Sequence, residues 1–164
     1  LYNVPGRTSL NMEAETTLKL SLHENIIGIK EASSDLSQIT KIISNTSDSD
    51  FRVWSGNDDE TFSIMALGGF GVVSVASNII GNQIKTMMGS ILEGNIESAA
   101  NHHKELLPLF QGLFWATNPI LIKRALNISW FNVGGLRLPM VDSKEFENEF
   151  SKLISKYDID VTKT

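Results

Sequence analysis

The sequence predicts an α/β fold built on a parallel sheet. Four short apolar segments, at residues 1–4, 26–30, 51–54 and 72–76, alternate with stretches whose apolar residues recur at helical spacing. The last of these segments is almost continuously apolar, which is typical of a parallel strand covered on both faces. Four β–α units in a row favour right-handed crossovers and a sheet that is either half of an eight-stranded β/α barrel or a small doubly wound sheet.

The first two predicted helices have recognisable starts. Asn11 is expected to cap a helix that runs to about residue 22, after a turn at Pro5 and Gly6. Asp35, with Gln38 three residues later, resembles a capping box and predicts the start of the second helix.

The next two helices have clear boundaries as well. The acidic stretch at 57–60 opens a helix that Gly68 ends, and a further helix from about 80 to 93 ends at Gly94. We therefore predict that residues 1–94 form the β/α part of the molecule.

Only helices are expected beyond this point. One long helix contains Pro108, which should kink it, and a second has Pro119 at its first position. Asp142 with Glu145 is expected to start the last helix. Residues 95–164 are therefore predicted to be a separate α-helical domain.

Composition excludes several classes of protein. The 164 residues carry a net charge of −5, so no basic excess indicates nucleic acid or an anionic membrane as a partner. No apolar run approaches the roughly 20 residues of a membrane span. The chain has no cysteine, which excludes disulfides, thiolate metal sites and a cysteine nucleophile. We expect a cytoplasmic protein.

Lys30 is the first candidate for chemistry because an apolar strand ends on it. A lysine amine can attack a ketone to form a Schiff base, provided that it loses its proton, and burial favours the neutral form. Glu31 is not expected to be its counter-ion, since successive strand side chains point to opposite faces. Most lysines at strand ends are simply solvated, so the case depends on the neighbouring residues.

Polar residues stand at the carboxyl end of each predicted strand, where both candidate architectures place active sites. They are Tyr2, Lys30, Ser55 and Ser74. Tyr2 could carry a proton on its phenol, and Arg7 offers a planar fork suited to a carboxylate. A strand tyrosine usually packs in a core and a loop arginine is usually solvated. Together, however, an amine, a proton carrier and a carboxylate anchor fit the Schiff-base chemistry of a keto acid.

Six motifs carry a resemblance to a known family. They are YNVPGRT (residues 2–8), GIKEA (28–32), SGND (55–58), GGFGVVSV (68–75), NPI (118–120) and LRLP (136–139). In this order and approximate spacing they resemble the dihydrodipicolinate synthase family. The resemblance spans essentially the whole chain but only the back half of the family's length. It implies strands five to eight of a (β/α)8 TIM barrel, followed by a C-terminal helical domain.

The resemblance also implies roles for five residues. Lys30 would be the Schiff-base lysine for pyruvate, and Tyr2 the phenol that relays protons. Arg7 would bind the carboxylate of the second substrate, aspartate semialdehyde. Val73 would pack beside the pyruvate methyl group, and the backbone at Gly56 would line the pocket. The implied enzyme needs no metal and no organic cofactor, and it is a homodimer or homotetramer.

In the family, the N-terminal half supplies a pyruvate-binding threonine pair, a second tyrosine and a site for feedback inhibition by lysine. The resemblance does not carry these features onto any residue of this sequence. Because the chain opens on what looks like a strand already under way, we expect a fragment of a longer protein that is inactive alone. Two alternatives stay open. One is a sibling pyruvate lyase acting on a sugar acid, of the N-acetylneuraminate lyase or 2-keto-3-deoxygluconate aldolase type, although these usually lack an arginine at the position of Arg7. The other is a non-catalytic half-barrel.

Overall fold

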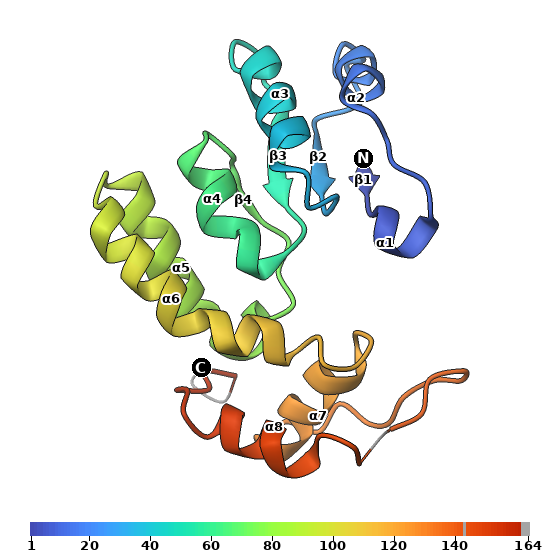
Figure 1. The fold of residues 1–164 in the computed structure, drawn as a ribbon, viewed down its shortest axis with the longest axis vertical. Coiled ribbons are helices and arrows are strands. Elements are labelled where there is room, and N and C mark those ends of the chain that lie inside the picture. The colour runs from blue at the N-terminus through green and yellow to red at the C-terminus, as the bar shows by residue number, and fades with distance from the viewer. Residues whose placement is uncertain (143, 162–164) are drawn as a thin grey trace. The chain divides into compact units, whose positions relative to one another are not determined.

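Four parallel strands form one sheet in the computed structural model, which describes residues 1–142 and 144–161. The strands are β1 (Tyr2–Asn3), β2 (Gly28–Glu31), β3 (Arg52–Ser55) and β4 (Gly71–Val72). They lie in the order β1-β2-β3-β4 (Figure 1). This confirms the predicted α/β class. A doubly wound sheet reverses its strand order at a switch point, whereas these four strands follow chain order, which is compatible with half of a β/α barrel.

Helices connect successive strands and cover one face of the sheet. They are α1 (Pro5–Thr8), α2 (Ala14–Leu20), α3 (Leu36–Thr46), the short 3₁₀ helix η1 (Asp58–Glu60) and α4 (Thr61–Ala66). Ile29 of β2 and Val53 of β3 are buried with Ile39, Ile42 and Ile64 of the helices in one apolar core. This core fixes which strand side chains face the helices and which face the opposite side.

The start of α2 differs from the prediction. Glu13, not Asn11, is the residue before the helix, and its side chain makes no capping hydrogen bond. The Asn11 side chain instead bonds to Asn3 and Gln38, so tertiary hydrogen bonds compete successfully with helix capping. The predicted turn after β1 is the one-turn helix α1, with Pro5 in its first turn.

The cap of α3 was predicted correctly, and only one half of its capping box forms. The Asp35 carboxylate accepts a hydrogen bond from the Gln38 backbone N–H at 2.9 Å. The Gln38 side chain turns inward and donates to Glu31 and to the carbonyl of Met12. The Gln38 side-chain amide therefore forms tertiary hydrogen bonds in the interior and does not cap the helix.

The fourth strand is shorter and earlier than predicted. The prediction was 72–76, but β4 ends at Val72. The reason is that the carbonyls of Val75 and Ala76 already accept from the N–H groups of Asn78 and Ile79, so the chain turns into the following helix.

The remaining helices are α5 (Ser77–Leu92), α6 (Ile96–Gly112), α7 (Ile120–Ile128) and α8 (Glu147–Ile154). The chain divides into two compact units, one of residues 1–74 and 91–96, the other of 75–90 and 97–161 in the described part. Most of α5 lies in the second of these units. The predicted domain boundary at residues 94 and 95 stays a prediction. None of the described helices is long and apolar enough to cross a membrane.

Helix starts in the second unit also differ in detail. Pro119 precedes α7 as its cap instead of standing inside it, and α8 begins after Phe146 rather than at Asp142. Helix α6 continues through Pro108. Phe110, Leu121 and Phe150 are almost fully buried and form part of this unit's own core.

Candidate active site

Successive side chains of β2 point to opposite faces of the sheet, so that buried residues alternate with a more exposed one. Ile29 and Glu31 are fully buried toward the helices, while Lys30 between them faces the other side of the sheet and is half-buried. This confirms that Glu31 points away from Lys30. The register places Tyr2, Lys30 and Trp54 side by side on β1, β2 and β3.

Lys30 and Tyr2 are in direct contact. The Lys30 Nζ lies 4.3 Å from the centroid of the Tyr2 ring. The backbone fixes this pairing, because the Lys30 N–H donates to the Leu1 carbonyl at 3.0 Å and the Ala32 N–H donates to the Asn3 carbonyl at 2.8 Å. The structure thus brings together a primary amine and a phenol that the sequence placed 28 residues apart.

Gly56 makes room for the Lys30 side chain. A Cβ atom at Gly56 would stand 3.0 Å from Lys30 Cε, 2.7 Å from Ala32 Cβ and 2.9 Å from the Glu31 carbonyl oxygen. The Gly56 N–H donates to that same Glu31 carbonyl at 2.6 Å. The lysine stem therefore passes directly against the backbone of the turn after β3, a position where any larger residue would displace it.

Val73 and Arg7 lie on the segments that follow β4 and β1. The Val73 N–H donates to the Ser55 carbonyl at 2.9 Å, which places Val73 beside the residue before Gly56. Arg7 is exposed in the last turn of α1. The Lys30 side chain contacts Tyr2 and the backbone of Gly56, and neither Arg7 nor Val73 takes part in these contacts.

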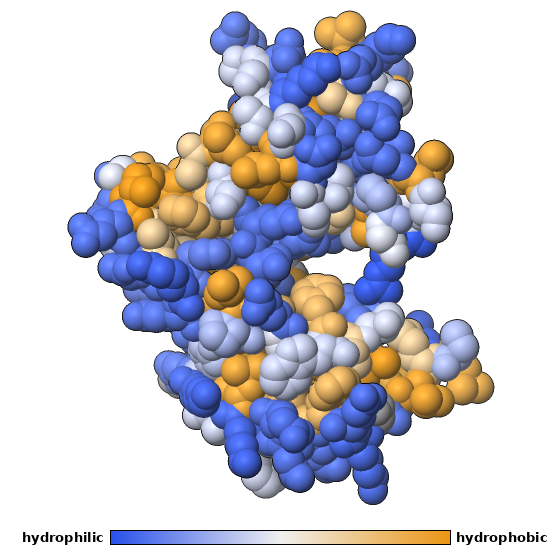
Figure 2. Space-filling view, viewed as in Figure 1, coloured by the Kyte–Doolittle hydropathy of each residue, from blue (hydrophilic) through white to orange (hydrophobic). Residues whose placement is uncertain are grey.

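The lysine side of the sheet is open to solvent at several apolar positions. The relative exposures are 51% for Tyr2, 57% for Phe70 and 47% for Val73. Figure 2 shows one face of the molecule, viewed as in Figure 1, on which orange hydrophobic residues lie among blue hydrophilic ones. Lys30 and Tyr2 line neither of two surface grooves among the described residues: one groove includes Ile43, Arg52 and Phe70, and the other includes His102 and Tyr157.

Trp54 pairs with Lys30 in the strand register and Gly28 lies on the same face of β2 as Lys30, and sequence reasoning missed both as site residues. A Cβ atom at Gly28 would stand 2.4 Å from Trp54 Cζ3, so the indole lies over the backbone of β2. The Trp54 ring also meets Phe70 edge-on, with centroids 5.3 Å apart. A signal was available in the sequence, because Gly28 and Lys30 share one face of β2 just as Arg52 and Trp54 share one face of β3.

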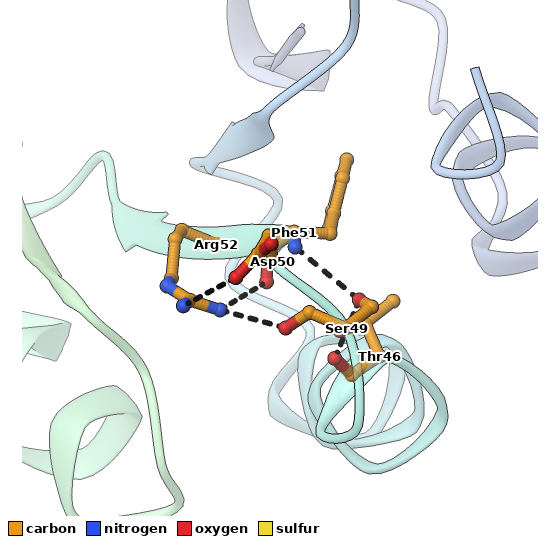
Figure 3. Close-up of polar contacts among 5 residues, drawn as sticks. All are labelled: Thr46, Ser49, Asp50, Phe51 and Arg52. Atoms are coloured by element: carbon orange, nitrogen blue, oxygen red, sulfur yellow. Dashed lines mark hydrogen bonds and ion pairs between the residues drawn. The ribbon is translucent and has the colours of Figure 1, made fainter. Parts of the chain in front are cut away.

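Arg52 secures the beginning of β3 on this same side. Its Nη1 donates to the Ser49 carbonyl at 2.8 Å, and its Nη2 lies 3.4 Å from an Asp50 carboxylate oxygen (Figure 3). Its guanidinium carbon lies 5.8 Å from the centroid of the Phe70 ring. These contacts occupy Arg52 at the amino end of the strand, away from the strand end where Lys30 stands.

Comparisons with known proteins agree on one family. Residues 1–157 match the Dihydrodipicolinate synthetase family. The 4-hydroxy-tetrahydrodipicolinate synthase of Dehalococcoides mccartyi strain CBDB1 is 54% identical over 145 residues, which are 88% of this chain and 48% of that protein. The same-named protein of Thermoanaerobacter sp. strain X514 is 49% identical over 159 residues, which cover 96% of this chain and 53% of that one.

Solved structures give the same result. The crystal structure of dihydrodipicolinate synthase from Thermotoga maritima is matched with a TM-score of 0.89 and 43% identity, over 94% of this chain and 54% of the other. The Aquifex aeolicus structure is matched with a TM-score of 0.91 and 36% identity, over 96% and 54%. The chain therefore spans about half the length of the relatives it matches. On the motifs, the fold and these matches, the chain belongs to the Dihydrodipicolinate synthetase family.

Proposed function

We propose that this chain is the C-terminal half of a Schiff-base lyase that condenses pyruvate with aspartate semialdehyde to 4-hydroxy-tetrahydrodipicolinate. The observation that carries the proposal is the Lys30 amine held 4.3 Å from the centre of the Tyr2 ring on the neighbouring strand. The names of the relatives support the choice of reaction. The active unit is a complete barrel, meaning a protein that contains this chain together with four preceding β–α units.

Lys30 would act as the nucleophile. Its neutral amine attacks the keto carbon of pyruvate, and the resulting carbinolamine loses water to give an imine. Loss of a proton from the pyruvate methyl group gives an enamine, whose carbon adds to the aldehyde of aspartate semialdehyde. The amino group of that substrate then attacks the imine carbon, which closes the ring and breaks the bond to Lys30, so that the free amine is regenerated. The protonated imine accepts the electron pair, so this chemistry needs neither a metal nor an organic cofactor. Tyr2 would relay the protons that these steps move.

The other site residues would bind and orient the substrates. Arg7 presents a planar fork that can hold the carboxylate of aspartate semialdehyde through two hydrogen bonds. Val73 would pack against the pyruvate methyl group, and Gly56 leaves the space through which the lysine reaches the pocket.

The complete barrel would place β1 to β4 as strands five to eight, with residues 95–164 as a C-terminal helical domain. In this chain β1 and β4 are the edge strands of the sheet, and in the complete barrel each would pair with a further strand along its outer edge. We further propose a cytoplasmic homodimer or homotetramer.

Borohydride trapping tests the proposed function. Incubation of the complete barrel with pyruvate and sodium borohydride should leave a reduced pyruvyl group on Lys30, identified by peptide mass spectrometry. The 164-residue chain alone should show little or no turnover, because half of the barrel wall is missing from it. An adduct on a different lysine, or substantial turnover by the chain alone, would contradict the proposal.

Arg7 separates this reaction from that of a sugar-acid lyase. Replacing Arg7 with lysine keeps the charge and removes the fork, so the KM for aspartate semialdehyde should rise about tenfold while pyruvate trapping stays unchanged. Steady-state kinetics with the second substrate varied would measure this. Arg137→Lys, at another exposed arginine, is the matched control. A variant that leaves the KM unchanged while longer hydroxylated aldehydes are better substrates would favour the sugar-acid alternative.

A further inference from the structure

A buried polar cluster lies behind the strand that carries Lys30, on the side of the sheet facing the helices. Its centre is Glu31, whose side chain is fully buried, with Asn3 and Gln38 also almost completely buried around it. A buried carboxylate is costly unless hydrogen bonds replace its hydration. The reaction proposed above uses none of these three side chains.

The Glu31 carboxylate accepts three hydrogen bonds and donates none. Oε1 accepts from Asn3 Nδ2 at 3.0 Å and from Gln38 Nε2 at 3.3 Å, and Oε2 accepts from the Ser33 backbone N–H at 3.3 Å. An ionised carboxylate only accepts, so it matches three converging donors, whereas a glutamine would turn one NH₂ group toward them. The cluster therefore selects glutamate specifically over its neutral isostere.

Asn3 connects this carboxylate to the segment that follows β1. Its Oδ1 accepts from the Met12 N–H at 2.9 Å, while its Nδ2 donates to the Met12 carbonyl at 3.3 Å and to Asn11 Oδ1 at 2.9 Å. Asn3 thus binds both backbone groups of Met12 and closes residues 4–11 into a loop. Arg7 lies within that loop.

Gln38 ties the far end of the same loop to α3. Its Nε2 donates to the Met12 carbonyl at 3.2 Å, and its Oε1 accepts from Asn11 Nδ2 at 2.9 Å. Both ends of the Arg7 loop are consequently attached, through two amides, to one carboxylate on β2. Lys30 and Tyr2 are held by strand pairing instead, on the opposite face.

We propose that Glu31 is a positioning residue for the second substrate: its carboxylate orients Asn3 and Gln38 and, through them, the loop that presents Arg7. This inference rests on the proposed function. It separates two steps of the reaction, since Glu31 should matter for binding of aspartate semialdehyde and much less for imine formation at Lys30.

The test uses Glu31→Gln in the complete barrel. The KM for aspartate semialdehyde should rise about fivefold, the size expected for the net loss of one ordinary hydrogen bond that orients the loop, while the rate of pyruvate trapping changes by less than about twofold. Glu13→Gln is the matched control, because Glu13 is an exposed carboxylate that accepts from Asn11 at 3.1 Å in the same loop.

Two further measurements keep the outcome decisive. Gln38→Met removes only the α3 side of the cluster, so it should raise the same KM in a smaller degree even where Glu31→Gln does not fold. Amide hydrogen exchange of residues 6–11 should accelerate in Glu31→Gln relative to Glu13→Gln, whether or not the protein is active. Unchanged exchange together with an unchanged KM, or equal losses in trapping and in second-substrate binding, would overturn the inference. A wild-type barrel that forms no adduct would refute the proposed function, while the exchange comparison would still decide the role of Glu31 in the loop.

Discussion

Replacing Lys30 with arginine is expected to abolish the covalent pyruvate adduct and to lower kcat in the complete barrel by on the order of 10⁴-fold or more. The guanidinium preserves the positive charge and most of the stem length, but it stays protonated and cannot condense with a ketone. Arginine should also preserve a cation over the Tyr2 ring, so that the fold is disturbed little. Borohydride trapping followed by mass spectrometry and a turnover assay would measure both effects.

Lys41→Arg is the matched control for this substitution. Lys41 is an exposed lysine on α3 whose amine pairs with Glu15, so the same exchange there should leave trapping and turnover unchanged. The Lys30 prediction fails if Lys30→Arg retains an adduct on another lysine with near-normal turnover. That result would mean that the amine of Lys30 is not the nucleophile.

The sequence predicted the strands well because their signal is local. Each of the four apolar runs contains or overlaps a strand, and the parallel order follows from the helices between them. The helix starts were less predictable, because they depend on distant partners. Asn11 has the side chain of a good cap, yet it bonds to Asn3 and Gln38, and only the folded chain brings these amides together.

The candidate site also contains features that local sequence predicts and features that only the folded chain shows. Lys30 and Tyr2 could be found from the sequence because the carboxyl ends of parallel strands meet at one edge. The partners of Glu31 could not, since strand alternation says only that its side chain turns toward the helices. The space that Gly56 leaves for the lysine stem depends on the distance between two turns, and no local pattern encodes that distance.

Gly28 is a position where one added methyl group should destabilise the fold strongly. A Cβ atom there would lie 2.3 Å from the Arg52 carbonyl oxygen and 2.4 Å from the Trp54 ring. The first neighbour is backbone of the paired strand, so the clash cannot be relieved by a side-chain rotation alone. Either β2 and β3 move apart, or their hydrogen bonds distort, and the indole beside Lys30 must shift as well.

Gly28→Ala is therefore expected to lower the free energy of unfolding by about 3 kcal/mol, at the upper end for overpacking. Urea unfolding of the complete barrel, followed by circular dichroism, would measure it as a lower midpoint. Gly89→Ala is the control, because an added Cβ there meets nothing within 4 Å inside helix α5. Alanine's higher helix propensity should raise stability at that site by about 0.5–1 kcal/mol. Equal midpoints for Gly28→Ala and the wild type would show that β2 and β3 are not packed as closely at Gly28 as the structure has them. The position of the Trp54 ring over Gly28 would then be wrong as well.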